Sequence, residues 1–154
     1  MIVTSAYLVA RTYLGTEEGE GRDNNSAIVG WLREVAPWAT GDEIAWCSVF
    51  VHHVARVLSL QRAKSLRARS WLAIGTPVEL ADARPEEDVV SLRRGRGLQP
   101  GPEVIDAPGH VGFFAGRVPG QVTVLCGNQS DSVTHARFPV DQVLGVRRLV
   151  QETT

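Results

Sequence analysis

The chain has 154 residues, of which 44% are hydrophobic and 21% charged, and its formal net charge is -1. That length suits one domain with a sizeable core, so residues 1–154 are predicted to form a single domain of ordinary globular composition. The near-neutral charge provides no overall field that would attract nucleic acid or an anionic membrane, and neither is expected as a partner.

The N-terminal segment carries no recognisable secretion signal. No basic residue precedes its apolar stretch, and the longest uninterrupted apolar run extends only from Ala6 to Ala10. Such a run is too short for the core of a signal peptide or for a membrane span. We therefore expect synthesis in the cytoplasm, with delivery by other means if the protein acts elsewhere.

The first half of the chain is predicted to be helical. Apolar residues recur there at helical spacing, and Gly- and Pro-containing stretches interrupt the pattern. Residues 47–58 show the clearest helical period. The predicted helices span residues 3–14, 27–35, 47–58 and 65–74.

The second half consists of short β-type runs separated by Gly/Pro turns. Helices followed by strands predict an α+β fold in which N-terminal helices pack on a small antiparallel sheet. A long Gly/Pro-rich connection, residues 93–109, joins the first two strands, and loops of this length are typically functional or disordered. The predicted strands span residues 88–92, 111–115, 122–126 and 144–149.

Cys47 lies in the first turn of the clearest helix. Phe50, Val51 and Val54 share its helical face, so its side chain is expected to point into the protein. One interpretation is a small buried hydrophobic residue. The other is a nucleophile, because the free N–H groups and the dipole at a helix start favour a thiolate and can bind an oxyanion.

A thiol nucleophile needs a general base, and histidine is the natural one. His52 and His53 follow Cys47 on the same helix but lie off its face, and His135 sits in a polar segment typical of a surface position. His110 instead opens the predicted strand "GHVGFFAG", where small neighbours allow another element or a substrate to approach closely. His110 is therefore the preferred base.

The base also needs a polar partner to orient its ring. Asn128 directly follows the strand after His110, and a hairpin turn near Pro119 and Gly120 would return the end of that strand to the start of the first. This register predicts that Asn128 lies near His110. Weaker candidates for the same position are Asp106, Gln129 and Asp131.

Neither a metal nor a cofactor is expected. The chain has no CxxC, HxxxH or HxxE spacing and no glycine-rich phosphate loop. Its two cysteines, Cys47 and Cys126, suggest a reduced protein, with Cys126 in the core. The arginines of "RRGRG" lack interleaved aromatic residues and favour a solvated loop over a nucleic-acid site.

Several segments follow one another along the chain in a recognisable order. They are "WCSVFV", "SLRARSWL", "PEEDVVSLRRG", "GHVGFFAG", "VTVLCGNQSDSV" and "LGVRR". Together they resemble the NlpC/P60-like and CHAP-like cysteine peptidases, above all a phage-associated branch whose members cut cell-wall peptide. The resemblance extends over nearly the whole chain. It departs from the family at Ala45, where relatives often have proline, and at "PEEDVV", where a Pro-Gly-Asp turn is usual.

The resemblance implies a papain-like fold with a defined catalytic set. Cys47 matches the nucleophile, His110 the base and Asn128 the orienting residue. The loop from Arg93 to Gly109, with Trp46 and Trp71 as weaker candidates, could form the walls of a substrate cleft, although packing explains each tryptophan at least as well. Gln129 is a weak candidate for substrate binding.

The implied function is a peptidoglycan hydrolase, either an endopeptidase or an N-acetylmuramoyl-L-alanine amidase. Without a signal, a holin, a phage particle or a secretion machine would deliver it to the periplasm or cell wall, as a phage lysin or an interbacterial effector. An effector would have a cognate immunity protein as its partner. The alternatives are a catalytically idle module that binds wall peptide or protein, and an acyltransferase or deamidase acting on protein.

Overall fold

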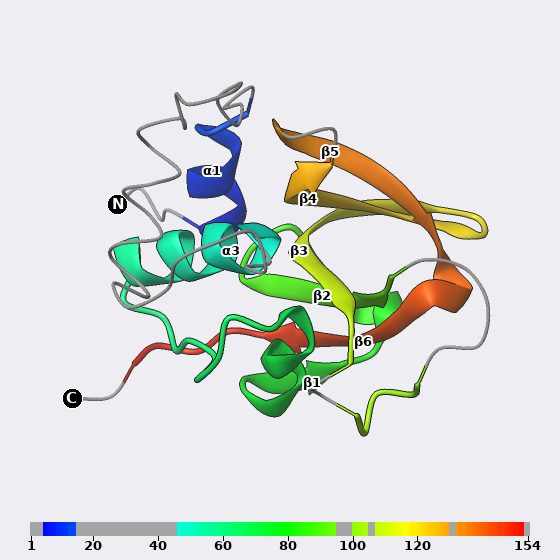
Figure 1. Cartoon of the computed structure of the whole chain (residues 1–154). Helices are drawn as coiled ribbons and strands as arrows, with labels where there is room; N and C mark the ends of the chain where they lie inside the picture. Colours follow the sequence, from blue (N-terminus) through cyan, green and yellow to red (C-terminus); the bar gives the residue numbers. More distant parts are fainter. Residues whose placement is uncertain (1–4, 15–45, 95–99, 105–106, 130–131, 153–154) are drawn as a thin grey trace, which may run out of the picture.

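The computed structural model describes residues 5–14, 46–94, 100–104, 107–129 and 132–152, without the side chains of residues 46, 128, 129 and 132. Two α-helices lie on one side of a curved six-stranded sheet (Figure 1). All strand pairs are antiparallel, which confirms the predicted α+β architecture of helices followed by sheet. The helix predicted at 27–35 lies outside the described residues.

The helix that carries Cys47 forms as predicted. Helix α3 spans Trp46–Val57, one residue earlier at each end than its apolar period indicated. Helix α1, Ala6–Arg11, is shorter than the predicted helix 3–14. It begins where the Ser5 hydroxyl accepts a hydrogen bond from the Leu8 backbone N–H at 3.2 Å, which satisfies one of the free N–H groups of the first turn.

The helix predicted at 65–74 is wrong in type and extent. The structure has a 3-10 helix, η1, at Ala68–Ala73, with no side-chain cap at its start. Its residues from Ala68 to Leu72 are all buried. The segment is therefore packed on every side and not along one face only. An amphipathic α-helix, which buries a single face, does not form here.

The predicted strands are confirmed as β2, β3, β4 and β6, and two edge strands were not predicted. Strand β1 is three residues long and contains Pro77, which cannot donate to a ladder. In strand β5 the partly buried Thr134, Ala136 and Phe138 alternate with the exposed His135 and Arg137, but the run is short and mostly polar and was interpreted as a surface segment. The sheet order is β1-β6-β2-β3-β4-β5. The strands span Thr76–Val78 (β1), Asp88–Arg93 (β2), Gly109–Val118 (β3), Gln121–Gln129 (β4), Ser132–Pro139 (β5) and Val143–Arg148 (β6), and short 3-10 helices lie at Leu80–Asp82 and Val140–Gln142.

The sheet separates two groups of buried apolar side chains. The helix-side cluster contains the buried residues of α1 and α3 together with Val111 and Phe113 of β3. The far-side cluster contains Phe114 of the same strand and residues of β2, β4 and β6. Strand β3 therefore contributes side chains to both clusters, because consecutive residues of a strand point to opposite faces of the sheet.

Gly112 lets β3 and β4 pack closely. The two strands pair with Phe113 opposite Leu125, and they turn at Pro119 and Gly120 as predicted. A Cβ atom on Gly112 would lie 2.5 Å from Val124 Cγ1 and 2.7 Å from Cys126 Cβ. No side chain larger than hydrogen fits at this position without moving β4.

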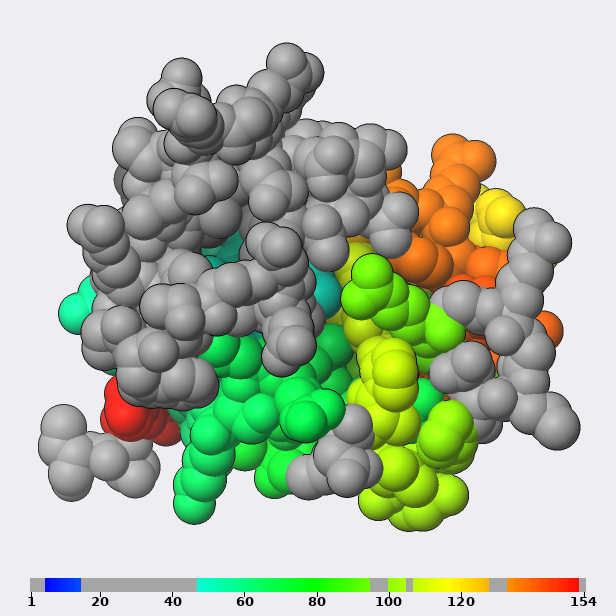
Figure 2. Space-filling view, in the orientation of Figure 1, coloured from blue at the N-terminus to red at the C-terminus, as the bar shows by residue number. Residues whose placement is uncertain are grey.

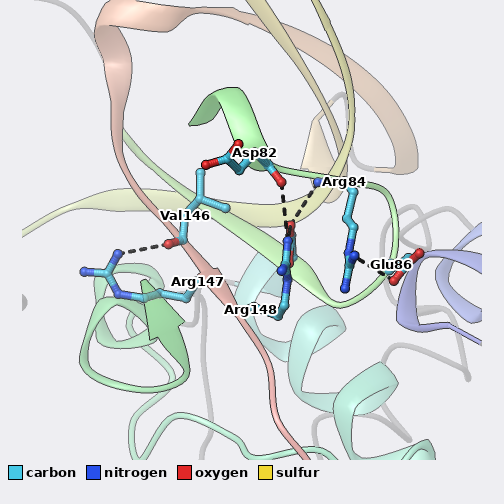
Figure 3. A network of polar contacts seen from close by, with 7 residues as sticks. Asp82, Arg84, Glu86, Val146, Arg147 and Arg148 are labelled. Carbon is cyan, nitrogen blue, oxygen red and sulfur yellow. Dashed lines mark hydrogen bonds and ion pairs between the residues drawn. The ribbon is translucent and has the colours of Figure 1, made fainter. Parts of the chain in front are cut away.

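A buried ion pair joins β2 to β6. Asp88 and Arg148 are directly opposite in the register of these strands. The Arg148 guanidinium donates to both Asp88 carboxylate oxygens, at 2.7 and 2.9 Å, and the Arg84 backbone N–H donates to the same carboxylate at 2.9 Å. Asp88 is fully buried, whereas the neighbouring Arg84–Glu86 side-chain pair is about half exposed. Figure 3 shows Arg148 together with the Arg84–Glu86 pair.

We expect Arg148→Met to lower the free energy of unfolding by about 3–5 kcal/mol, because it leaves a buried carboxylate without its cation. Arg84→Met is the matched control and should cost less than about 1 kcal/mol, since its ion pair is exposed. Urea denaturation of both variants at pH 7 measures the difference. Equal losses in the two variants would contradict the importance of the buried pair.

Candidate active site

Cys47 is the second residue of α3 and is only 2% exposed. It belongs to the helix-side cluster together with Phe50, Val51 and Val54, which confirms that its helical face points into the protein. The cluster also contains Val111, the residue after His110. The start of α3 therefore packs against the start of β3.

Burial raises the pKa of the Cys47 thiol. Interactions with the backbone of Val111 and Ser48, and the positive charge of Arg94, act in the opposite direction but are outweighed. The helix start was expected to favour the thiolate, and in this structure the loss of hydration dominates instead. The resting thiol therefore keeps its proton, and a base has to remove it before or during any nucleophilic attack.

His110 is the second residue of β3 and is 7% exposed. Its ring lies 5.5 Å from the Phe138 ring, centroid to centroid, and its Nε2 atom is buried without a hydrogen-bond partner. Burial, with a smaller contribution from Arg94, lowers the pKa of His110 to about 4. The imidazole is therefore neutral near pH 7 and has a free lone pair or N–H at Nε2.

Asn128 lies near the end of β4, within two residues of Cys126. The β3–β4 register ends at Phe113↔Leu125, and β4 shifts register against β5 between Cys126 and Gln129. Continued unchanged, the β3–β4 register would place Gly112 opposite Cys126 and His110 opposite Asn128. The close approach of Cys126 to Gly112 supports that continuation. The Asn128 side chain is outside the described part, so its interaction with the imidazole stays a prediction.

The structure brings the backbone elements of the predicted site together but does not pair the two reactive side chains. The Cys47 thiol lies near the Val111 backbone, one residue from His110. Among the described residues, no hydrogen bond joins the thiol to the imidazole, because alternation along β3 directs His110 toward Phe138 on the far side. An engaged pair would require the imidazole to turn around the end of the strand.

Arg94 lies near the candidate site, and the sequence analysis did not single it out. It directly follows β2, it is exposed, and its charge acts on both Cys47 and His110. The register of β2 and β3 pairs Arg93 with Gly109, so the end of β2 lies beside the start of β3. The antiparallel argument used for Asn128 could have placed Arg94 here too, whereas its loop was considered only as a solvated loop and as a possible wall of the cleft.

Trp71 is not a wall of an open cleft. It is fully buried, and its indole N–H donates to the Ser48 hydroxyl at 2.9 Å. Of the two interpretations of this residue, the structure therefore supports packing. The side chains of Trp46 and Gln129, the other candidates for substrate contact, are not among those described.

The remaining histidines have partners away from Cys47. His52 Nε2 lies 2.9 Å from the Ser65 carbonyl oxygen, and His53 Nε2 lies 2.8 Å from the Tyr13 hydroxyl. His135 is exposed and contacts the Tyr7 hydroxyl at 3.0 Å. A cavity of about 410 Å³ includes His52 in its lining but neither Cys47 nor His110.

Within the described ranges, no three His, Cys, Asp or Glu side chains gather as they would to hold a metal ion. In the same part of the chain, no helix has the length and apolar character needed to cross a membrane. Cys126 is fully buried in the far-side cluster, as predicted, and burial raises the pKa of its thiol.

Comparison with known proteins identifies the fold. The structure superimposes on that of NlpC1 from Trichomonas vaginalis with a TM-score of 0.56 and 16% sequence identity, over 95% of this chain and 44% of that one. The present chain thus spans less than half the length of that protein. No family model and no curated protein matches the sequence. The likeness confirms the predicted NlpC/P60 fold.

Two buried histidines should make the protein sensitive to acid. Burial lowers the pKa of both His52 and His110 from an ordinary 6.5 to about 4, so between these pH values the unfolded chain binds more protons than the folded one. Stability is therefore complete above about pH 6.5 and falls toward pH 4, by roughly 3 kcal/mol for each histidine.

Chemical denaturation of the wild type, His52→Gln and His110→Gln across this range measures the effect. Each substitution should make the free energy of unfolding less dependent on pH, by the amount that the replaced histidine contributes. The interpretation fails if the slope in His110→Gln equals that of the wild type.

The two thiols should react slowly in the folded protein. Burial raises the pKa of both Cys47 and Cys126, and alkylation requires an accessible thiolate. We expect labelling by iodoacetamide at pH 7 to be at least about 10-fold slower than in the denatured chain. Peptide mass analysis assigns the labelled residue, and fast labelling of Cys47 without denaturant would contradict its burial.

Proposed function

We propose that the protein is a peptidoglycan hydrolase that cleaves an amide bond of the cell-wall peptide by a thiol mechanism. One observation carries the proposal. The start of α3, with Cys47, packs against the start of β3, with His110, in an NlpC/P60 fold. The β3–β4 register supports Asn128 as the residue that orients the imidazole.

The mechanism begins from a neutral thiol and a neutral imidazole. His110 accepts the Cys47 proton as the sulfur attacks the amide carbonyl, and later donates it to the leaving amine. Water then hydrolyses the thioacyl enzyme with the same histidine as base. Free N–H groups at the start of α3, and the charge of Arg94, would stabilise the oxyanion.

The first step requires two local movements. The imidazole turns from Phe138 toward Cys47, and the buried thiol becomes reachable by the scissile carbonyl. In the turned position Asn128 would accept or donate a hydrogen bond at the imidazole nitrogen that faces away from sulfur. Substrate binding favours this turn of the imidazole, because the thiolate is stabilised only when it attacks a bound carbonyl.

Delivery and partners follow from the same proposal. An enzyme of this kind reaches peptidoglycan through a holin, a phage particle or a secretion machine. If it is an interbacterial effector, an immunity protein protects the producing cell. The amide between sugar and peptide and the bonds within the stem peptide share this chemistry, and the masses of the released fragments distinguish them.

A binding module without catalysis is the second candidate function. The observations that favour it are the raised pKa of Cys47 and the absence of a hydrogen bond to His110 among the described residues. Such a module would hold wall peptide without cleaving it.

We expect Cys47→Ala to reduce release of peptidoglycan fragments by at least about 10³-fold, since the nucleophile is removed. His110→Ala should have a similar effect, and Asn128→Ala a smaller one. Cys126→Ala is the matched control, because it deletes a buried thiol in the other cluster and should retain activity. Mass analysis of digests of purified peptidoglycan provides the measurement.

Thermal unfolding verifies that each variant is folded. Cleavage by Cys47→Ala would place the nucleophile elsewhere. No cleavage by the wild type, together with retained binding to the sacculus, would favour the binding module.

A further inference from the structure

Arg69 is a fully buried cation that binds the chain leading to His110. It lies in η1, and its side chain has no exposed surface. Its Nε atom donates to the Pro108 carbonyl at 2.9 Å. Its Nη1 atom lies within hydrogen-bonding distance of the carbonyls of Pro100 (2.9 Å), Gly101 (2.8 Å) and Val104 (3.2 Å).

Arg69 binds the turn between Gly101 and Val104 and, further along the chain, Pro108, which directly precedes β3. The Val104 N–H donates to the Gly101 carbonyl at 3.2 Å, so one nitrogen of Arg69 binds carbonyls from both ends of this turn. In the space-filling view, the green segment around η1 lies beside the yellow-green segment that leads into β3 (Figure 2). The guanidinium therefore connects η1 to the approach to β3.

Gly109 brings the same chain directly against the arginine stem. A Cβ atom on Gly109 would lie 2.7 Å from Arg69 Cγ and 3.1 Å from the Leu92 carbonyl oxygen. The first residue of β3 thus passes between the Arg69 side chain and the backbone of β2. Any larger side chain there would push the start of β3 away from one of the two.

The interactions of Arg69 differ from those of an ordinary structural ion pair. Among the described residues no carboxylate forms an ion pair with it. Backbone carbonyls accept its hydrogen bonds, and the Glu103 carboxylate adds a favourable charge without direct pairing. A guanidinium presents donors in a fixed plane and can bind several carbonyls at once, whereas a lysine ammonium is a single point. Its Nη2 atom remains buried without a partner, so the binding of this turn does not use all its donors.

We propose that Arg69 is a positioning residue, which holds residues 100–104, Pro108 and the Gly109 backbone so that His110 is presented at the start of β3. The proposal rests on the proposed function in one respect only, namely that His110 is the general base. Arg69 does not touch the reacting atoms. It acts through the backbone that immediately precedes the histidine.

The test uses Arg69→Met, Arg69→Lys and Gly109→Ala, with Arg117→Met as matched control. Arg117 is an exposed arginine on the same strand as His110. Histidine ring NMR of ¹⁵N-labelled protein gives the His110 titration, hydrogen exchange gives the protection of the 109–111 amides, and peptidoglycan digestion gives kcat and KM separately.

In Arg69→Met we expect the His110 titration midpoint to move from about 4 toward its ordinary value of 6.5, as the histidine becomes more exposed. Exchange of the 109–111 amides should accelerate at least about 10-fold. We expect kcat to fall about 100-fold with KM changed much less, as for a misplaced catalytic group. Arg69→Lys should recover part of each change, and Arg117→Met should show none.

The outcomes separate this proposal from the proposed function. If the wild type cleaves no peptidoglycan but the titration and exchange change as expected, the positioning role stands and the proposed function fails. If Arg69→Met does not fold, Arg69→Lys and Gly109→Ala decide by the same two measurements. The positioning role is overturned if the folded Arg69 and Gly109 variants keep the His110 titration and the exchange rates of Arg117→Met.

Discussion

Strand β3 has to fill two cores at once, and the rest of the structure depends on that constraint. Consecutive side chains of a strand point to opposite faces. Val111 and Phe113 therefore pack with the helices, while Phe114 packs with the far-side cluster. Close pairing with β4 at Gly112 keeps the strand in this register. Cys47 and His110 consequently lie toward opposite faces of β3, near its start, with the Val111 backbone beside the thiol.

Much of this arrangement was predictable where a residue pattern has a single physical cause. The apolar period of α3 predicted which face of Cys47 is buried, and the turn at Pro119 and Gly120 predicted the β3–β4 hairpin. The errors occur where tertiary contacts replace local preference. In place of the predicted helix 65–74, burial on all sides produces a short 3-10 helix at Ala68–Ala73, and β5 is an edge strand whose alternation is short and mostly polar.

The sequence singles out the candidate site residues but not the residues that support them. Cys47, His110 and Asn128 are residue types typical of a thiol mechanism, and the predicted hairpin relates the last two; their roles stay a prediction. Arg69 and Arg94 act through strand pairing and through backbone carbonyls that come from distant parts of the chain. Sixteen basic residues give no sequence signal that separates a buried arginine from solvated ones. Only the packing of η1 against the approach to β3 distinguishes Arg69 from its neighbours.

The same burial that stabilises the site works against its reactivity. Desolvation favours the neutral form of both groups, so it raises the pKa of the Cys47 thiol and lowers that of the His110 imidazole. A thiolate–imidazolium pair is thus disfavoured at rest, and Arg94, whose charge reaches both residues, favours the thiolate while it opposes the imidazolium. Charge separation would become favourable only once a bound substrate accepts the sulfur's negative charge as an oxyanion near the start of α3. In the proposed mechanism the bound substrate completes the electrostatics and the protein contributes position: α3 would position the sulfur, and β3 with the turn before it would position His110 as the base.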